Sequence, residues 1–205
     1  MTIPYDELIG LWRKEVPMNP VAGPRERLIR SAILMMREHG VAATGLTDLL
    51  AHSKTARGSI YLHFPGGKSE LMEQATLHAG QQITAMIEAL IAASSSPAEV
   101  VVGLVEVWKQ ILETSSFTAG CPIVAAAQSG SDSPTVQEAS ATVFGDWTSR
   151  LADFLRSTGM DSAAAASFGS VIISTIEGAI IQCRSTKSLR PLDDAGTNLV
   201  KLLEL

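Results

Sequence analysis

The stretch from Thr55 to Lys68 holds the side chains best suited to binding an anionic polymer. Its sequence, TARGSIYLHFPGGK, contains hydroxyl, guanidinium and ammonium groups and no Asp or Glu. Such groups donate hydrogen bonds to phosphate oxygens and to base edges. Gly58 lies inside a predicted helix, where glycine costs about 1 kcal/mol relative to alanine. That cost is understandable if the helix backbone must come close to DNA.

The charge of the chain is divided unevenly along its length. The net charge is -5, but residues 21–68 hold seven basic and three acidic residues, a net charge of +4. Residues 69–205 hold seven basic and 15 acidic residues, a net charge of -8. A basic module joined to an acidic body is typical of a phosphate-binding domain attached to a domain with another role. A chance fluctuation is the alternative, because +4 is a modest value.

Nucleophilic or metal chemistry has little support in the sequence. Cys121 is the candidate nucleophile, but its neighbours are Gly120, Pro122 and apolar residues. His78 is the only histidine after residue 63, and a thiol without a basic neighbour stays largely protonated. No Cys/His cluster has the spacing of metal ligands. We therefore expect no catalytic residue, no metal and no cofactor, and we predict that the protein is not an enzyme.

The elements around this segment are predicted to be helices. Ala, Leu, Glu, Ser and Met are frequent, and β-branched residues rarely alternate with polar ones, which favours an all-α fold. The segments expected to be helical are 24–40, 44–51, 55–64, 69–93, 96–115, a segment beginning at Pro122, 134–158, 162–183 and 191–205. Residues 1–20 are predicted to be an extension with one short helix around residues 8–14.

Two short helices joined by a tight turn, and braced by a preceding helix, form a helix-turn-helix. Thr44 is the expected N-cap of the first of the pair. If Ile60 points inward, Thr55, Gly58 and Leu62 lie on the opposite face of the second helix. We divide the chain into an extension (residues 1–20), a DNA-binding domain (21–68) and a helical ligand-binding and dimerisation domain (69–205).

The residues of this head resemble the DNA-binding domain of the tetracycline-repressor (TetR) family. The resemblance covers about 50 residues and is most specific from Gly58 through Tyr61 and Phe64 to Lys68. Gly45, the Pro65-Gly66-Gly67 insertion and Gly120-Cys121-Pro122 resemble the LmrA/YxaF-like subgroup. The family implies a homodimer that represses from a palindromic operator in double-stranded DNA and is released by a small molecule.

The resemblance assigns DNA-contacting roles to particular positions. Thr44 and Thr47 match positions near the backbone-contacting start of the first helix of the pair. The start of the recognition helix is matched by Thr55, Arg57, Gly58 and Ser59. Tyr61, His63 and Lys68 match phosphate-contacting positions. Plain packing is an alternative for Tyr61 and an equal one for His63, and a solvated charge is the alternative for Arg57.

Two residues depart from the family pattern. Lys54 stands where the family usually has the turn glycine, so a non-glycine residue is expected at positive φ, at a cost of about 1 kcal/mol. Leu62 replaces a commonly polar or aromatic residue, which indicates either an apolar contact with a thymine methyl group or a lost base contact.

The body is expected to hold a cavity for a small molecule. Aromatic and large apolar residues are concentrated there, and pockets for such ligands are mostly apolar with a few polar groups. The residues predicted to line the site are Met86, Trp108, Phe117, Cys121, Gln128, Phe144, Trp147, Phe168 and Ile172. An ordinary aromatic core is an equal alternative for any one of them. Few charged residues lie in these helices, so the expected effector is neutral or weakly polar.

The last two helices are predicted to form a dimer. Small residues between Ala163 and Gly178 permit close approach of a partner helix, and Leu199 to Leu203 form an apolar stripe. Burial of the small-residue surface and of the apolar stripe in a two-fold interface would give a four-helix bundle, with two helices from each subunit. Packing within the monomer alone is the alternative.

The sequence favours a cytoplasmic protein without a membrane segment. Residues 1–16 lack the apolar core of a signal peptide, and the longest uncharged run, between Glu113 and Asp132, contains Gly120 and Pro122. The predicted function is a ligand-responsive, DNA-binding repressor. The alternative is a helical small-molecule-binding or interaction protein whose head no longer reads DNA.

Overall fold

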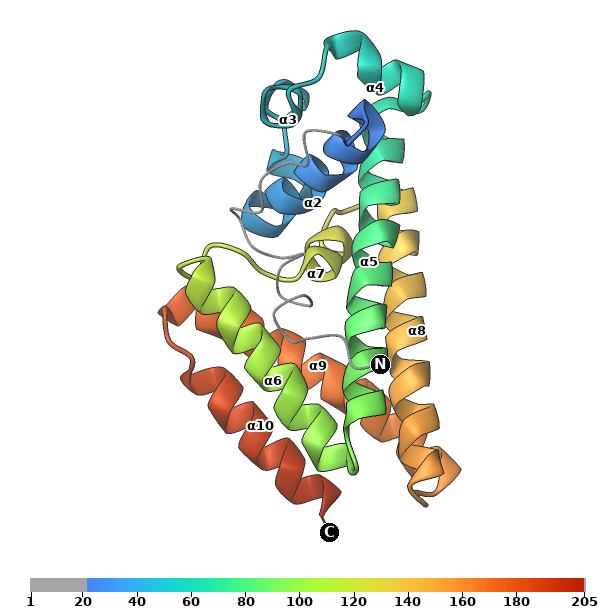
Figure 1. The fold of residues 1–205 in the computed structure, drawn as a ribbon, viewed down its shortest axis with the longest axis vertical. Coiled ribbons are helices and arrows are strands. Elements are labelled where there is room, and N and C mark those ends of the chain that lie inside the picture. The colour runs from blue at the N-terminus through green and yellow to red at the C-terminus, as the bar shows by residue number, and fades with distance from the viewer. Residues whose placement is uncertain (1–21, 205) are drawn as a thin grey trace. The chain divides into compact units, whose positions relative to one another are not determined.

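The computed structural model describes residues 22–204, which form helices joined by turns and short loops (Figure 1). The helices are α2 (Pro24–Ala43), α3 (Leu46–Ser53), α4 (Arg57–His63), α5 (Gly67–Ala93), α6 (Pro97–Thr114), α7 (Pro122–Ala127), α8 (Pro134–Ser157), α9 (Ser162–Thr186) and α10 (Arg190–Leu203). No strand occurs among these described residues, and the predicted all-α class is confirmed. The short helix expected around residues 8–14 lies outside them.

The described residues fall into two compact units. The head unit comprises residues 22–82 and 120–143, and the body unit comprises residues 83–119 and 144–204. Helices α5 and α8 contribute residues to both units. The predicted DNA-binding domain lies within the head unit, and the domain boundary at residue 68 stays a prediction.

The head unit is organised around α2. Pro24 begins this helix, where its missing N–H costs nothing. Gly40 has φ +84°, a backbone conformation that other residues adopt only under strain, and it interrupts the regular helix before the chain continues to Ala43. Helix α2 packs against α3, α4 and α7. The apolar residues of α2 to α4 that are buried without exposed surface are Leu28, Ala32, Met36, Leu49 and Ile60.

The body unit is held together by α6, α9 and α10, with α10 packing against both other helices. Gly196 lets α10 approach α6, because a Cβ atom there would lie 3.0 Å from a methyl carbon of Val105. Asp161 caps α9 by accepting hydrogen bonds from the backbone N–H groups of Ala163 (2.9 Å) and Ala164 (3.2 Å). These hydrogen bonds lower the pKa of the Asp161 carboxyl group.

Helix α9 is unusually apolar for its length. By length and composition it could cross a membrane, and 39% of its most apolar stretch is buried within the chain. It packs against α6 and α10 in the body unit.

Candidate nucleic-acid interface

The recognition helix α4 has one buried side and one exposed side. Ile60 is completely buried against the head unit. Tyr61 and Leu62 are 58% and 75% exposed, which are the largest values among the large apolar residues of the described chain. Arg57 and Gly58 are also exposed, while Ser59 and His63 are half-buried. The structure therefore brings most of the predicted DNA-contacting residues of this helix to its outer side.

The turn between α3 and α4 contains the predicted positive-φ residue. Lys54 has φ 52° and ψ 45°, so the expectation from its departure from the family pattern is confirmed. Its backbone N–H donates to the carbonyl of Ala51 at 3.3 Å, which ends α3. The left-handed conformation costs a non-glycine residue roughly 1–2 kcal/mol.

Arg27 of α2 stabilises this turn from the other side. Its Nε donates to the carbonyl of Ser53 at 3.0 Å, and its Nη2 donates to the carbonyl of Lys54 at 3.4 Å. Its Nη1 donates to the carbonyl of Ala22 at 2.7 Å, which fixes the start of the described chain to the same group. These hydrogen bonds from a charged donor offset part of the strain at Lys54. Sequence reasoning missed Arg27.

Thr44 does not cap α3. The N-cap is Gly45, which makes no side-chain capping hydrogen bond, so the expected capping role of Thr44 is wrong. Thr44 is completely buried, and its hydroxyl donates to the carbonyl of Gly40 at 2.7 Å. The positive φ of Gly40 allows three more residues to follow before the turn, and this places Thr44 inward. Thr47, on the first turn of α3, is exposed.

The two remaining predicted residues flank α4. The hydroxyl of Thr55 lies 2.7 Å from the Ser53 hydroxyl and is half-buried. Lys68 is half-buried on the first turn of α5. The Gly66 N–H donates to the Glu70 carboxylate at 2.7 Å, which fixes the start of α5.

The predicted effector-binding residues lie in different parts of the chain. Met86, Trp108, Trp147 and Ile172 are buried in the body unit, and Phe117, Phe144 and Phe168 are half-buried. Phe144 and Trp147 are brought together edge to face, with ring centroids 5.5 Å apart. Cys121 and Gln128 flank α7 in the head unit. These nine residues stay a prediction of the effector site.

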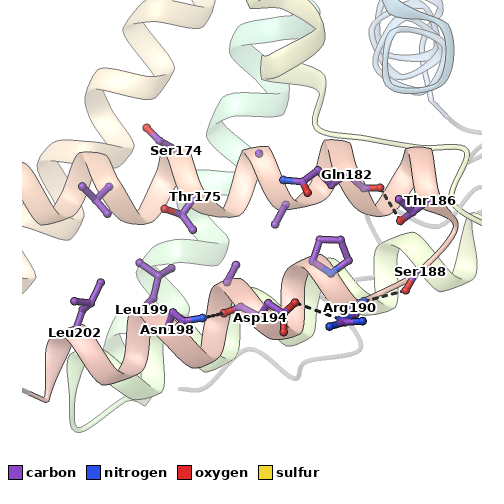
Figure 2. A pocket seen from close by; sticks show the side chains of 15 residues that line it. Ser174, Thr175, Gln182, Thr186, Ser188, Arg190, Asp194, Asn198, Leu199 and Leu202 are labelled. Carbon is purple, nitrogen blue, oxygen red and sulfur yellow. Dashed lines mark hydrogen bonds and ion pairs between the residues drawn. The ribbon is translucent and has the colours of Figure 1, made fainter.

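Two cavities of the body unit are lined by other residues. A groove of about 810 Å³ lies between α9 and α10 (Figure 2). Val171, Gly178, Ala179, Leu199 and Leu202 supply much of its apolar surface. A second cavity, of about 390 Å³, lies between α6 and α10 beside Val102, Val105 and Val200. Neither cavity contains any of the nine predicted effector residues.

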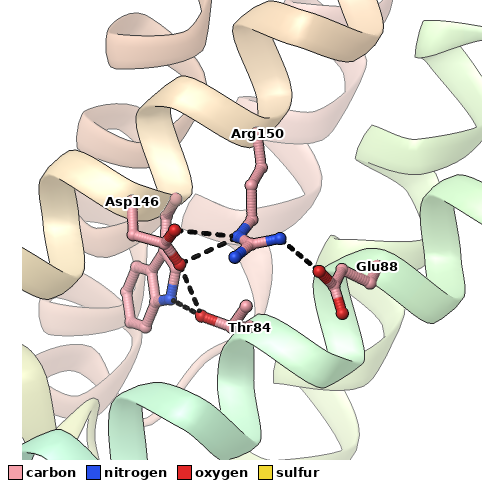
Figure 3. Close-up of polar contacts among 5 residues, drawn as sticks. Thr84, Glu88, Asp146 and Arg150 are labelled. Carbon is pink, nitrogen blue, oxygen red and sulfur yellow. Dashed lines mark hydrogen bonds and ion pairs between the residues drawn. The ribbon is translucent and has the colours of Figure 1, made fainter.

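A polar network joins α5 to α8 inside the body unit (Figure 3). The indole N–H of Trp147 donates to the Thr84 hydroxyl, which donates to the Asp146 carboxylate, both at 3.0 Å. Arg150 donates from Nε to both oxygens of Asp146 and from Nη1 to Glu88. The hydrogen bonds from Arg150, and then that from Thr84, lower the pKa of the Asp146 carboxyl group. The network fixes the register of α5 against α8.

Two family models match the chain. The model of the tetR family of bacterial regulatory proteins matches residues 28–75, and the model of the LmrA/YxaF-like C-terminal domain of transcriptional regulators matches residues 97–198. A helix-turn-helix-type transcriptional regulator of Mycobacterium tuberculosis is 36% identical over 188 residues, which are 88% of this chain and 94% of that protein. The chain belongs to the TetR family.

Within the TetR family the chain is a member of the LmrA/YxaF-like subgroup, as its Gly120-Cys121-Pro122 sequence led us to expect. The regulator LmrA of Bacillus subtilis is 28% identical, over 82% of this chain and 90% of its own length. A TetR regulator from Legionella pneumophila has the same fold, with a TM-score of 0.79 at 21% identity over 91% of this chain and all of that one. The chain is therefore a DNA-binding transcriptional regulator.

TetR-family proteins are transcriptional regulators and not enzymes, so the prediction that this chain is not an enzyme is confirmed by its family. Both of its cysteines are buried free thiols. Burial raises the pKa of the Cys183 thiol, which keeps it protonated. TetR-family regulators are soluble proteins that bind operators, dimerise and respond to small-molecule effectors.

Proposed function

We propose that this TetR-family regulator is a homodimeric repressor of a palindromic operator that is released when a small molecule binds its body. The exposed side of α4 is the observation that supports this proposal most directly. Arg57, Tyr61 and Leu62 face outward there, and no carboxylate occurs from Leu49 to Ser69. A short helix of this composition fits the major groove, where side chains reach base edges while flanking cations neutralise phosphates.

A second copy of the chain is the partner that fits the groove between α9 and α10. The groove presents Val171 and Leu202, which are 40% and 47% exposed, next to small residues such as Gly178 and Ala179. Small residues permit close approach of helices, and a two-fold axis brings the same surface of both copies together. The result is a four-helix bundle of α9 and α10 from each subunit.

The dimer gives the DNA interaction its geometry. Two recognition helices related by a two-fold axis read half-sites about one helical turn, roughly 34 Å, apart. Helix α5 follows α4 after three residues, so a change in α5 reaches the recognition helix directly. An effector releases the operator only to the extent that it binds more tightly to a conformation in which the spacing of the two recognition helices no longer matches that of the two half-sites.

The proposed effector is neutral or weakly polar. Met86, Trp108 and Ile172 are buried apolar side chains of the body unit, and pockets that take such ligands are built mainly from residues of this kind. Sequence reasoning did not single out Glu177, which is a buried carboxylate of α9. A carboxylate close to the effector would favour a cationic compound over a neutral one. A ligand panel that contains matched neutral and cationic compounds therefore tests the proposed charge of the effector.

The decisive experiment is a gel shift with DNA from the region upstream of the protein's own gene. We expect a retarded complex that survives excess competitor DNA and weakens steeply between low and high salt, because phosphate contacts release counterions. Each retarded complex should contain two protein chains. A protein that binds small molecules but gives no competitor-resistant complex is the alternative interaction protein, and this result contradicts the proposal.

A further inference from the structure

Leu62 is the most exposed large apolar residue of the described chain, and its position makes this exposure informative. Single exposed leucines are common on protein surfaces. Leu62, however, lies on α4, the helix proposed above to face DNA, and it is 75% exposed there. It cannot donate or accept a hydrogen bond. A base edge that presents only hydrogen-bond donors and acceptors would lose its bound water on contact with the Leu62 side chain and would gain no hydrogen-bond partner in return.

The surface beside Leu62 has room for a methyl-sized group. Gly58 precedes Leu62 by four residues and therefore lies on the same side of α4, one turn earlier. Helical side chains lean toward the N-terminus of their helix, so Leu62 covers the turn that contains Gly58. A Cβ atom built on Gly58 would meet no other atom within 4 Å. Gly58, which has no side chain, therefore leaves open space beside the exposed Leu62 on the recognition helix, and we call this space the notch.

The other exposed aromatic of α4 does not fill this notch. Tyr61 is directed toward the start of α5, because a Cβ atom built on Gly67 would lie 3.5 Å from the Tyr61 ring. Ile60 is completely buried. Arg57 carries a charge and flanks the notch from the first turn of the helix. Among the described residues of α4, Leu62 is the apolar side chain placed to contact a base.

We infer that the notch formed by Gly58 and Leu62 takes the C5-methyl group of a thymine in each half-site of the operator. Thymine is the one base of DNA that presents a methyl group in the major groove. Burial of that methyl group against Leu62 is worth about 0.8 kcal/mol, or about fourfold in affinity per half-site. The inference rests on the proposed DNA-binding function and specifies one base of its target.

The test removes the methyl group from the DNA and the leucine from the protein. Duplexes that bind the full-length protein are selected from a random library, and each thymine of the selected duplex is replaced in turn by deoxyuridine. We expect one symmetry-related thymine per half-site at which this replacement weakens wild-type binding about fourfold. The same replacement should not change the affinity of Leu62→Ala for the duplex. Leu62→Met, which keeps a large apolar side chain, should still show most of the fourfold loss.

A second variant tests the position of the methyl group beside Gly58. Gly58→Ala adds a methyl group to the protein next to the position proposed for the thymine methyl, and so crowds it. This variant should bind the thymine duplex more weakly than wild type, and deoxyuridine at the sensitive position should restore part of the loss. An equal loss on both duplexes would overturn the placement beside Gly58.

The outcomes separate this inference from the proposed function. Selection that yields no specific duplex contradicts the DNA-binding proposal and removes the basis of the inference. A specific duplex with no deoxyuridine-sensitive thymine, or with a sensitivity that persists in Leu62→Ala, overturns the inference alone. Circular dichroism checks that the variants remain folded, which we expect because Leu62 and Gly58 are exposed.

Discussion

Arg37 and Gly120 hydrogen-bond to each other in both directions across 83 residues of sequence. The Nε of Arg37 donates to the Gly120 carbonyl at 3.0 Å, and the Gly120 N–H donates to the Arg37 carbonyl at 3.0 Å. Arg37 is only 2% exposed, although it carries a permanent charge. The pair ties α2 of the head unit to the segment that precedes α7.

Loss of this pair should destabilise the head unit. Arg37→Met keeps the aliphatic length of the side chain but leaves the buried Gly120 carbonyl without its charged donor. We expect the free energy of unfolding to fall by about 2 kcal/mol, measured by urea denaturation. Arg57→Met removes an exposed arginine of α4 and serves as the control, with an unchanged urea midpoint. Equal midpoints for Arg37→Met and wild type would contradict the structural role of the pair.

Replacement of Lys54 should separate strain from charge in the turn. Lys54→Gly removes a side chain from a left-handed residue, and we expect a gain of up to about 1 kcal/mol in unfolding free energy. Lys54→Ala keeps the left-handed strain and should show no gain. Both variants lose the same positive charge, so both should bind DNA more weakly and with a shallower salt dependence. Similar melting temperatures for the two variants would contradict the strain at this position.

The Asp146 network should stop contributing to the free energy of unfolding in acid. Arg150 and Thr84 lower the pKa of the Asp146 carboxyl group below its ordinary value of 3.8, so the ionised form is favoured in the folded state. Its contribution is therefore fully present above pH 3.8 and disappears as the pH falls through the lower, folded-state pKa.

The measurement compares wild type with Asp146→Asn across pH. The side chain of Asp146 is 39% exposed, so we expect a difference of at most about 1 kcal/mol at neutral pH. This difference should stay constant down to pH 5 and vanish in stronger acid. Asp153→Asn, in an exposed pair with Arg156, is the matched control and should have a smaller effect. A difference that grows as the pH falls would be inconsistent with the network.

Tyr61 should be needed for DNA binding but not for assembly. Tyr61→Ala removes a 58% exposed ring and hydroxyl from α4, and we expect operator binding to be lost in a gel shift. The oligomeric state, measured by analytical ultracentrifugation, should not change. Tyr61→Phe keeps the ring and distinguishes the phosphate contact of the hydroxyl from packing of the ring. Unchanged affinity of Tyr61→Ala would contradict the assigned DNA-facing side of the helix.

A charge in the groove between α9 and α10 should dissociate the proposed dimer. Leu202→Glu places a carboxylate in this groove, and we expect monomers together with a loss of operator affinity of at least tenfold. Val102→Glu is the matched control, because Val102 is 51% exposed on α6 and does not line the groove. The two variants are compared by light scattering after size-exclusion chromatography. Dimers of Leu202→Glu would place the interface elsewhere on the chain.

The sequence predicted the helices well because their boundaries depend on local chemistry. Proline at Pro24, Pro122 and Pro134 begins helices, and the structure places α2, α7 and α8 at these residues. The positive φ of Lys54 was also predictable, because the family that this segment resembles usually has a glycine at this position of the turn. Thr44 was misplaced because the backbone conformation of Gly40, four residues earlier, determines the direction of its side chain.

The roles of Arg27 and Arg37 were not predictable from the sequence. Each arginine donates to backbone carbonyls that lie far along the chain, and any residue type can supply a carbonyl. No motif therefore marks the acceptor. The effector site poses a similar difficulty, because the sequence shows that large apolar residues such as Trp108 are concentrated in the body but not how much space remains between them.

The two buried thiols offer a way to time the opening of each unit of the regulator. Cys121 belongs to the head unit and Cys183 to the body unit, and their side chains are 4% and 0% exposed. Alkylating reagents attack accessible thiolates, so modification of either cysteine reports a local or global opening event. A single labelling reaction analysed by mass spectrometry therefore gives the modification rate of each cysteine, and hence the opening of each unit, without the introduction of a further cysteine.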